Sequence, residues 1–429
     1  MEIYFETYGC TANYNSTEIM KGLVRQAGFN LTSNVNYADL IVINSCIAKE
    51  PTEEKIRRRI QGLLKEKKRI ILAGCMPGTN KGKLSQENLF LLDTSQVKNL
   101  VNLIQDVFSG TYEPEKYLRH RKEIKLTLPK IPKEKFIGIT QISEGCLGNC
   151  SYCITKLAKG KLFSYPKEKI LESIKSDLDS GAKEIWLTSQ DCASYGNDER
   201  KYLLPELLGE ITEIRKNFCL RVGMSNPDNL LKILSDLIKI YEDKKIFKFL
   251  HIPVQSGSNK ILRLMNRNYT GEDFLKIIRE FRKKFPQIHI STDVIVGFPG
   301  ETEKDFQETY DLIREIKPET INVSKFWPRP ETSAEKMKSQ INADTKKQRA
   351  IKLLCLHKEI CNGIQKKFPG TIHEVLVDQK GFENTYLARD ENYKLFAVLS
   401  REKILGKKLK VKVKKVTPHY LISERLNPR

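Results

Sequence analysis

The stretch Glu144–Cys153 reads EGCLGNCSYC and contains three cysteines, Cys146, Cys150 and Cys153, separated by three residues and then by two. A structural zinc site usually takes four ligands as two pairs, and a disulfide takes two cysteines. No second cysteine pair follows this loop. The loop therefore offers three thiolates to one site and leaves a fourth position without a ligand from the loop.

Three thiolates on so short a loop can wrap three corners of an iron–sulfur cube. The fourth iron then has no protein ligand, and an open coordination site is what a reacting molecule needs. The alternative is a zinc ion that a distant His or Cys completes. Zinc loops usually begin with two closely spaced cysteines, so this alternative is the weaker one. We interpret the loop as the holder of a reactive iron–sulfur cluster.

The loop lies near the start of a series of apolar segments that alternate with helical patterns, which predicts an α/β unit over residues 136–365. Six such units are too few for a closed eight-fold barrel and predict an open, partial (βα)6 TIM-like barrel. The chemistry of such barrels lies at the carboxyl ends of the strands, and the three-cysteine loop follows the first strand. The six predicted strands cover residues 136–142, 184–190, 220–225, 247–254, 289–297 and 320–328.

Polar residues and glycines near these strands are candidates for binding a cofactor. Polar side chains at strand ends can hold a ligand, and glycine lets the backbone approach one closely. The candidates are Ser189, Gln190, Asp191, Arg221, Ser225, Asn226, Gln255, Gly257, Gly297 and Gly300.

A second set of three cysteines is dispersed over residues 1–112. The apolar segments IYFETYG, LIVINS and RIILAG each run into a cysteine, and helical patterns between them predict a parallel sheet. Neighbouring strands lie about 4.8 Å apart, so their carboxyl ends can converge on a cluster-sized object. Ordinary burial explains one such cysteine but explains three poorly. The three residues are Cys10, Cys46 and Cys75.

Residues 113–135 form a charged, proline-containing connector, and residues 366–429 form a third unit of short alternating strands, which predicts a small all-β barrel. This unit holds 15 basic and 7 acidic residues. Its segment KKLKVKVKK predicts apolar side chains inside and lysines outside. Lysines on an edge strand also deter aggregation, but the number here favours an RNA-binding face. The lysines are Lys408, Lys410, Lys412 and Lys414.

The whole chain of 429 residues carries a formal charge of +21, which favours a polyanionic partner, although a lysine-rich surface also serves solubility. Ten cysteines are too few for a disulfide scaffold of this length. The sequence has no run of 18 apolar residues and no leader pattern, so we expect a cytoplasmic protein with no membrane partner.

The cysteine spacing of GCLGNCSYC resembles the signature of the radical S-adenosylmethionine (SAM) enzymes. Together with YGCTANYNS, VINSC, AGC, HIPVQSGS and GFPGET in this order, it resembles the methylthiotransferases over nearly the whole chain. WLTSQDCASYG and GMSNP are most similar to the archaeal and eukaryotic branch, which modifies N6-threonylcarbamoyladenosine beside the tRNA anticodon. PRPET departs from the more usual PRPGT at one loop.

This resemblance implies two 4Fe-4S clusters. The cluster on the three-cysteine loop binds and cleaves SAM, and an auxiliary cluster on the dispersed cysteines carries or receives sulfur. It implies that the methylthio group is added to C2 of the adenine and that the carboxyl-terminal barrel is a TRAM domain that binds tRNA. An electron donor protein and a sulfur source are the further partners.

Other functions stay open at this point. The target can be a ribosomal protein side chain or isopentenyladenosine in tRNA, or the chain can be a non-catalytic iron–sulfur sensor that binds RNA. Trp186 and Trp327 are able to stack on a base, but both lie in strand patterns, so we predict that they belong to the core.

Overall fold

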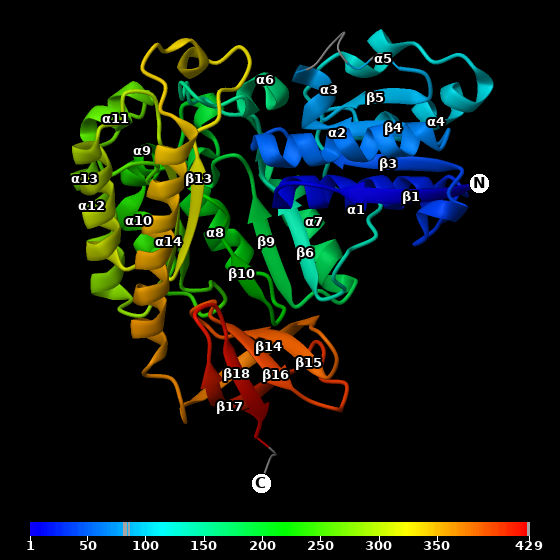
Figure 1. Ribbon diagram of the computed structural model, residues 1–429. Helices are drawn as coiled ribbons and strands as arrows, with labels where there is room; N and C mark the ends of the chain where they lie inside the picture. The colour runs from blue at the N-terminus through cyan, green and yellow to red at the C-terminus, as the bar shows by residue number, and fades with distance from the viewer. Residues whose placement is uncertain (80–83, 85, 427–429) are drawn as a thin grey trace.

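The computed structural model describes residues 1–79, 84 and 86–426. Figure 1 shows three units: a blue sheet with its helices at upper right, a green-to-yellow partial barrel at left, and a small orange-to-red β-barrel below. The predicted α/β architecture with an all-β carboxyl-terminal barrel is confirmed. No helix within the described residues is long and apolar enough to cross a bilayer.

The amino-terminal unit is a five-stranded parallel sheet in the order β2-β1-β3-β4-β5. Its strands are β1 (Glu2–Thr7), β2 (Asn30–Leu31), β3 (Leu40–Ser45), β4 (Arg69–Gly74) and β5 (Leu89–Asp93). Its main helices are α1 (Thr11–Gln26), α2 (Glu50–Lys65), α3 (Cys75–Thr79) and α4 (Leu100–Ser109). Every residue of β3 is buried, as expected for the central strand of a covered parallel sheet.

The second unit contains all six predicted strands, and they are parallel. Two triplets, β6-β9-β10 and β11-β12-β13, are joined by a bridge between Leu220 and Ile246, so the six strands form one open, curved wall. The strands are β6 (Ile137–Gln141), β9 (Glu184–Thr188), β10 (Cys219–Arg221), β11 (Phe249–His251), β12 (His289–Val296) and β13 (Thr320–Lys325).

Helices cover the outer face of this wall. The helices α12 and α13 each begin with a capping box, made by Thr270 with Asp273 and by Thr302 with Asp305, which satisfies their first N–H groups. The outer helices are α7 (Lys167–Asp179), α8 (Leu204–Thr212), α9 (Pro227–Lys232), α10 (Leu234–Ile240), α12 (Gly271–Lys284), α13 (Glu303–Ile316) and α14 (Ala343–Gln365).

The carboxyl-terminal unit is a closed barrel in the order β14-β15-β16-β18-β17. Val411 and Val413 are buried in its core and Leu409 is partly buried, as the alternation in KKLKVKVKK predicts. Its strands are β14 (Ile372–Lys380), β15 (Thr385–Arg389), β16 (Leu395–Leu399), β17 (Lys408–Val416) and β18 (Leu421–Arg425).

This barrel packs against the strand-start end of the six-stranded wall. The ring of Tyr393 lies 4.9 Å from that of Phe247 and 4.7 Å from that of Phe249, between ring centres. The Arg221 guanidinium lies 5.1 Å from the Trp186 ring, 4.9 Å from Phe249 and 5.5 Å from Tyr393. Arg221, a predicted cofactor-binding residue, therefore lies where the carboxyl-terminal barrel docks.

The connector joins the first two units by crossing α1. The backbone N–H of Ile131 donates to the Glu18 carbonyl at 2.9 Å, and that of Lys133 donates to the Glu18 carboxylate at 3.0 Å. A Cβ on Gly22 would lie 2.1 Å from the Pro129 carbonyl oxygen, so only glycine allows this crossing. Helix α1 also packs on β6.

The buried Glu18 predicts a pH dependence of stability. Burial raises its pKa from the ordinary 4.5 to about 7, so ionisation costs more in the folded state. The protonated Glu18 therefore contributes to the free energy of unfolding at low pH, and this contribution is lost as the pH rises from 4.5 through about 7. Between about pH 5 and pH 8, the free energy of unfolding should therefore fall by roughly 2 to 3 kcal/mol less in Glu18→Gln than in the wild type. Denaturant midpoints at the two pH values test this, and equal losses in both proteins would contradict it.

Candidate active site

The three-cysteine loop begins directly after β7 (Ser143–Glu144) and ends before α6 (Thr155–Lys159). The backbone N–H of Gly148 donates to the Cys146 sulfur at 3.2 Å. A Cβ on Gly148 would lie 3.3 Å from that sulfur and 3.7 Å from the Cys150 sulfur, so the two sulfurs flank this glycine. Burial raises the pKa of Cys146 to about 12, and the neighbouring thiolates Cys150 and Cys153 add to the effect. The loop thus gathers its three sulfurs.

Arg267 is a residue of this site that the sequence analysis missed. Its guanidinium donates to the Cys150 sulfur at 3.0 Å and to the Asn226 side-chain oxygen at 2.7 Å. A cation beside a thiolate stabilises its negative charge. Arg267 lies between α11 (Asn259–Leu264) and α12, in a segment whose sequence has no metal-ligand or helical pattern.

Asp191 and Asn226, predicted from different strand ends, lie together. The Asp191 carboxylate accepts from the Asn226 backbone at 2.9 Å, from the Asn226 amide at 3.0 Å and from the Asn229 amide at 2.6 Å. Since Asn226 also accepts from Arg267, a chain of contacts runs from Asp191 to Cys150. The two polar residues orient the cluster loop.

The other polar candidates on β9 and β10 also have partners in the protein. Gln190 accepts the Gly145 N–H at 2.7 Å, which fixes the entry to the cysteine loop. Ser189 accepts the Asp191 N–H at 3.1 Å. The buried Ser225 donates its N–H to the His251 carbonyl at 2.9 Å.

The remaining candidates follow β11 and β12. A Cβ on Gly257 would lie 2.6 Å from the Glu308 carbonyl oxygen, and one on Gly297 would lie 2.3 Å from Lys346 Cγ. The close packing of α13 against Gly257 and of α14 against Gly297 therefore explains why these positions require glycine. Gly300 and Gln255 have positive φ values, 82° and 66°.

Three adjacent strands, β1, β3 and β4, lead to the dispersed cysteines: Cys46 and Cys75 directly follow β3 and β4, and Cys10 lies three residues after the end of β1. A Cβ on Gly9 would lie 3.0 Å from the Cys46 sulfur, which places Cys46 against the segment that leads to Cys10. Burial raises the pKa of Cys75 to about 12, and the thiolates of Cys10 and Cys46 add to the effect. The fold thus brings the three dispersed cysteines to one edge of the sheet.

Two features at this edge favour negative charge. Cys10 is the N-cap residue of α1, so it lies at the positive end of a 16-residue helix dipole. The Ala48 N–H donates to the Cys46 sulfur at 3.5 Å. The Asn13 amide connects the segments that precede Cys10 and Cys46, because it donates to the Tyr8 carbonyl at 2.8 Å and to the Ser45 carbonyl at 3.0 Å.

A buried ion network connects the two cysteine sites. Glu144, just before the cysteine loop, accepts from Lys125 at 2.7 Å and from Lys159 at 2.9 Å. Both ammonium groups also donate to Thr94, which follows β5 of the amino-terminal sheet. Burial alone would raise the pKa of Glu144, but the two lysines hold it at about 2. Since Lys159 also interacts electrostatically with Cys75, the network ties both sites together.

The donor sets fit thiolate-ligated clusters. Within residues 1–79, 84 and 86–426, no group of three His, Cys, Asp or Glu side chains is arranged to hold a metal ion. Each cysteine set nevertheless lies on one loop or at neighbouring strand ends and has N–H or guanidinium donors to its sulfurs, which suits an iron–sulfur cluster. Because burial keeps Cys75 and Cys146 protonated without metal, ligation would release protons.

The predicted RNA-binding lysines of β17 differ in their surroundings. Lys408 pairs with Glu374 and Lys414 with Glu424, both at 2.7 Å. Lys410 is exposed and Lys412 partly buried, and neither forms an ion pair with any described residue. Strand pairing sets this difference, since Glu374 and Glu424 lie on the flanking strands β14 and β18.

Three family models match the chain. Residues 140–313 match the Radical SAM superfamily, residues 2–92 match "Uncharacterized protein family UPF0004", and residues 366–426 match the TRAM domain. The matched regions correspond to the partial barrel, the amino-terminal sheet and the carboxyl-terminal barrel.

Curated relatives match over nearly the whole chain. A probable threonylcarbamoyladenosine tRNA methylthiotransferase from Pyrococcus abyssi is 41% identical over 92% of this chain and 92% of its own length. The threonylcarbamoyladenosine tRNA methylthiotransferase of Homo sapiens is 35% identical over 98% of this chain and 73% of its own length.

Solved structures share the fold. The radical S-adenosylmethionine methyltransferase TsrM from Kitasatospora setae matches with a TM-score of 0.56 and 14% identity, covering 87% of this chain and 78% of that chain. The cobalamin-dependent S-adenosylmethionine radical enzyme OxsB matches with a TM-score of 0.54 and 12% identity, covering 82% of this chain and 56% of that chain. These structures show the fold alone, and the curated relatives show that the chain belongs to the threonylcarbamoyladenosine tRNA methylthiotransferase family.

Proposed function

We propose that this protein is a radical SAM methylthiotransferase that converts N6-threonylcarbamoyladenosine beside the tRNA anticodon into its 2-methylthio derivative. The observation that carries the proposal is the pair of three-cysteine sites, which the buried Lys125–Glu144–Lys159 network joins. Two clusters that act on one base must face the same cavity at a fixed separation. The ion network fixes the position of the cysteine loop relative to the amino-terminal sheet and so satisfies this requirement.

In this proposal Cys146, Cys150 and Cys153 hold a 4Fe-4S cluster, which supplies an open iron for SAM and the electron that cleaves it. Arg267 stabilises the Cys150 thiolate, and Gln190 fixes the loop at Gly145. The candidates for contacts to SAM remain Ser189, Gln190, Asp191, Ser225, Asn226, Gln255 and Gly300, whereas Arg221 lies where the carboxyl-terminal barrel docks, and Gly257 and Gly297 pack against α13 and α14.

Cys10, Cys46 and Cys75 hold the second 4Fe-4S cluster, which supplies the site for the sulfur. Lys159 and the amino terminus of α1 stabilise the negative charge of these thiolates. When bound there, one SAM would supply the methyl group and a second would supply the radical that removes hydrogen from C2. An electron donor protein and a sulfur source complete the reaction, and we place it in the cytoplasm.

The experiment that tests this function is mass spectrometry of nucleosides from tRNA incubated anaerobically with reconstituted protein. We expect 2-methylthio-N6-threonylcarbamoyladenosine from tRNA that carries the threonylcarbamoyl group and no product from tRNA that lacks it. Isopentenyladenosine tRNA and ribosomal proteins serve as alternative substrates in parallel reactions. A product from either of these alone would replace the proposed substrate, and cleavage of no SAM in any reaction would favour the sensor.

The carboxyl-terminal lysines yield a second prediction. If Lys410 and Lys412 contact phosphates, replacing both with Gln should reduce the slope of log affinity for tRNA against log salt by roughly 0.7 to 0.9 per lost contact. The matched control replaces Lys408 and Lys414, whose charges Glu374 and Glu424 already offset, and should change the slope less. An unchanged slope in the Lys410 and Lys412 variant would show that these lysines only protect the surface.

A further inference from the structure

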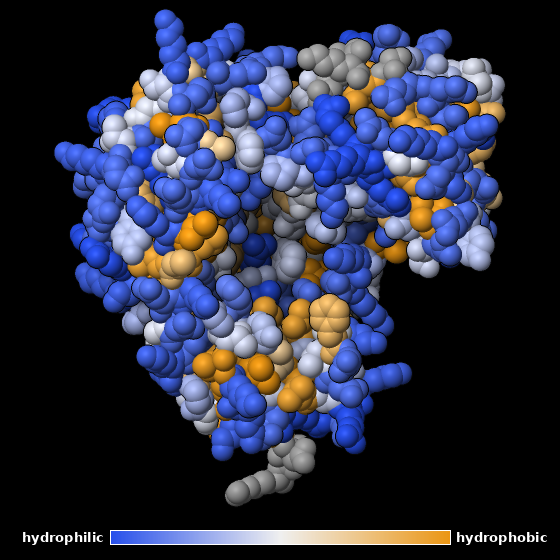
Figure 2. Space-filling model, in the orientation of Figure 1, coloured by the Kyte–Doolittle hydropathy of each residue, from blue (hydrophilic) through white to orange (hydrophobic). Residues whose placement is uncertain are grey.

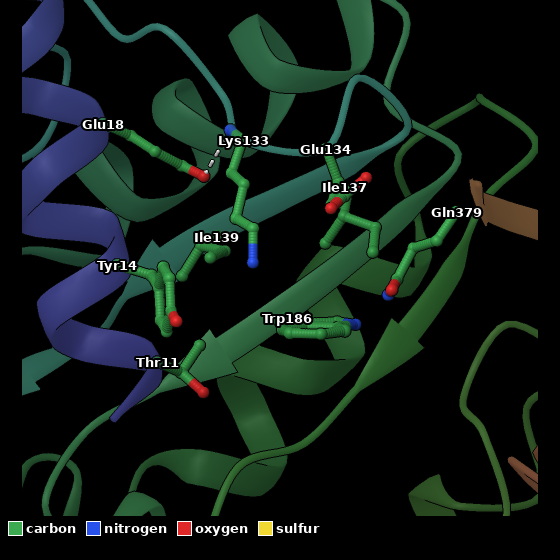
Figure 3. A pocket seen from close by; sticks show the side chains of 9 residues that line it. All are labelled: Thr11, Tyr14, Glu18, Lys133, Glu134, Ile137, Ile139, Trp186 and Gln379. Carbon is green, nitrogen blue, oxygen red and sulfur yellow. Dashed lines mark hydrogen bonds between the residues drawn. The ribbon is translucent and has the colours of Figure 1, made fainter. Parts of the chain in front are cut away.

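A pocket of about 230 Å3 lies where the three units of the molecule meet. Its lining comes from α1, the connector, β6, β9 and β14. Figure 2 shows that this face is hollowed between the amino-terminal unit, the partial barrel and the carboxyl-terminal barrel, and Figure 3 shows the lining residues. The volume lies below the usual range for drug-sized ligands and suits a single ring system.

Trp186 provides one aromatic wall of this pocket. The sequence predicted a core residue, but the side chain is only partly buried because β9 turns it into the open interior of the barrel. Arg221 lies over its ring at 5.1 Å, and its indole N–H donates to Glu184. The contacts with Arg221 and Glu184 fix the orientation of the indole. The part of the ring that they leave uncovered lines the pocket.

Tyr14 and Lys133 provide the facing wall. The Lys133 ammonium lies 4.8 Å from the centre of the Tyr14 ring, and Figure 3 shows it pointing into the space between Tyr14 and Trp186. The amide of Gln379, from β14, lines the pocket beyond Trp186. None of the Tyr14 hydroxyl, the Lys133 ammonium and the Gln379 amide forms a hydrogen bond or ion pair with any described residue. The pocket therefore offers aromatic surface and unused hydrogen-bonding groups.

The acidic residues of the pocket disfavour a phosphate. Glu18 and Glu134 both line it, and burial raises the pKa of both, that of Glu18 to about 7. Two carboxyl groups beside a single lysine leave no net positive charge for a phosphate dianion. A neutral, flat ring with polar edges matches the aromatic walls and the mixed donors and acceptors.

The position of the pocket links it to RNA. Thr11, which lines it, directly follows Cys10 of the auxiliary site, and Gln379 belongs to the barrel that carries the lysines. An RNA strand that contacts both the carboxyl-terminal barrel and the space between the cysteine sites would lie close to this hollow, because α1, β9 and β14 all line it. Single-stranded loops are recognised chiefly by stacking of splayed bases on aromatic side chains.

We propose that this pocket binds one unstacked RNA base that neighbours the target nucleotide, between Tyr14 and Trp186. The inference rests on the proposed function, because it takes a tRNA anticodon loop as the ligand, and it adds a second base-binding site apart from the reacting one. Lys133 and Gln379 hydrogen-bond to the edge of the base.

The chain offers a direct probe, because Trp186 and Trp327 are its two tryptophans. In a full-length Trp327→Phe protein, Trp186 alone reports on stacking. The ligands are a synthetic anticodon stem-loop RNA with threonylcarbamoyladenosine at the target position and a series that carries one abasic loop nucleotide each. We expect the intact RNA to quench Trp186 fluorescence, and one abasic position other than the target to remove the quenching. Binding without quenching, or loss of quenching only at the abasic target, would overturn the proposal.

Binding measurements provide the second arm. Tyr14→Ala and Trp186→Ala should each weaken RNA binding by about 5- to 150-fold, the range for loss of one stacked base. Trp186→Phe should retain much of the affinity, and Trp327→Phe should bind as the wild type does. Because stacking involves no phosphate, the salt slope should not change. If Trp186→Ala does not fold, Tyr14→Ala on the helix surface decides alone, and unchanged affinity there overturns the proposal.

The outcome is separable from that of the proposed function. Nucleoside analysis with the wild-type protein tests the methylthiolation, whereas quenching and affinity report only on binding. A protein that methylthiolates tRNA but shows no quenching rejects the pocket and leaves the function intact. Quenching without product rejects the function.

Discussion

Replacing Cys146, Cys150 and Cys153 together with alanine is expected to abolish SAM cleavage and to leave about half of the iron bound. Cleavage needs an iron with an open coordination position, and these three sulfurs are gathered on one loop that Arg267 and Gln190 hold in place. The measurements are iron content after reconstitution and 5′-deoxyadenosine formed under anaerobic conditions with a chemical reductant.

The matched control is Cys355→Ala. Cys355 is exposed on α14 and belongs to neither cysteine site, so its loss should change neither iron content nor cleavage. Full iron content in the triple variant would show that the loop holds no cluster. Persistent 5′-deoxyadenosine formation would place SAM cleavage elsewhere.

The strands that lead to the candidate site are predictable from the sequence because each is an apolar run that ends at a cysteine, a polar residue or a glycine. All six barrel strands and β1, β3 and β4 were found in this way. Asn30–Leu31 and Leu89–Asp93 were missed, since a two-residue strand has no detectable period and the other lies outside the predicted βαβ pattern. Local periodicity thus predicts a strand only when the strand is long enough or is marked at its end.

The contacts that hold the site were not predictable, because they join residues far apart in sequence. Arg267 and Cys150 are separated by 117 residues, and Lys159 and Thr94 by 65. No spacing rule connects such pairs, and only the fold brings them together. The cysteines themselves were predictable since their spacing and their places at strand ends are local properties.

Trp186 illustrates the limit for the interior of a partial barrel. A strand pattern predicts alternate faces, and in a closed barrel both faces are buried. Here the six-stranded wall is open, so inward-facing residues of β9 meet a pocket as well as the carboxyl-terminal barrel. The alternation predicts the strand, but the burial of Trp186 depends on how the three units dock.

The buried network of Lys125, Glu144 and Lys159 holds the two cysteine sites in a fixed relative position. Removing one member of a buried ion pair leaves an uncompensated charge, which costs several kcal/mol. The amino-terminal sheet therefore cannot separate from the cysteine loop without exposing or unpairing these groups. Under the proposed function, this fixed geometry would let two clusters address one base.

Replacing Cys10, Cys46 and Cys75 together with alanine should stop methylthiolation and spare SAM cleavage. The substitutions remove the thiols at the ends of β1, β3 and β4 but leave Glu144, Lys125 and Lys159 in contact with each other. The cysteine loop therefore keeps its position, and about half of the iron should remain.

Nucleoside mass spectrometry should show no methylthio product from this variant, while 5′-deoxyadenosine should still form at a rate within roughly threefold of the wild type, a difference below 1 kcal/mol in barrier. Cys10 is exposed and lies at the start of α1, so its loss should not disturb the buried core. Cys75 is buried, so a Cys361→Ala variant, which removes a buried thiol on α14 outside both cysteine sites, controls for the loss of packing. If SAM cleavage is lost together with product, the two cysteine sites do not have separate roles. Retained product with the full iron content would instead exclude an auxiliary cluster on these three cysteines.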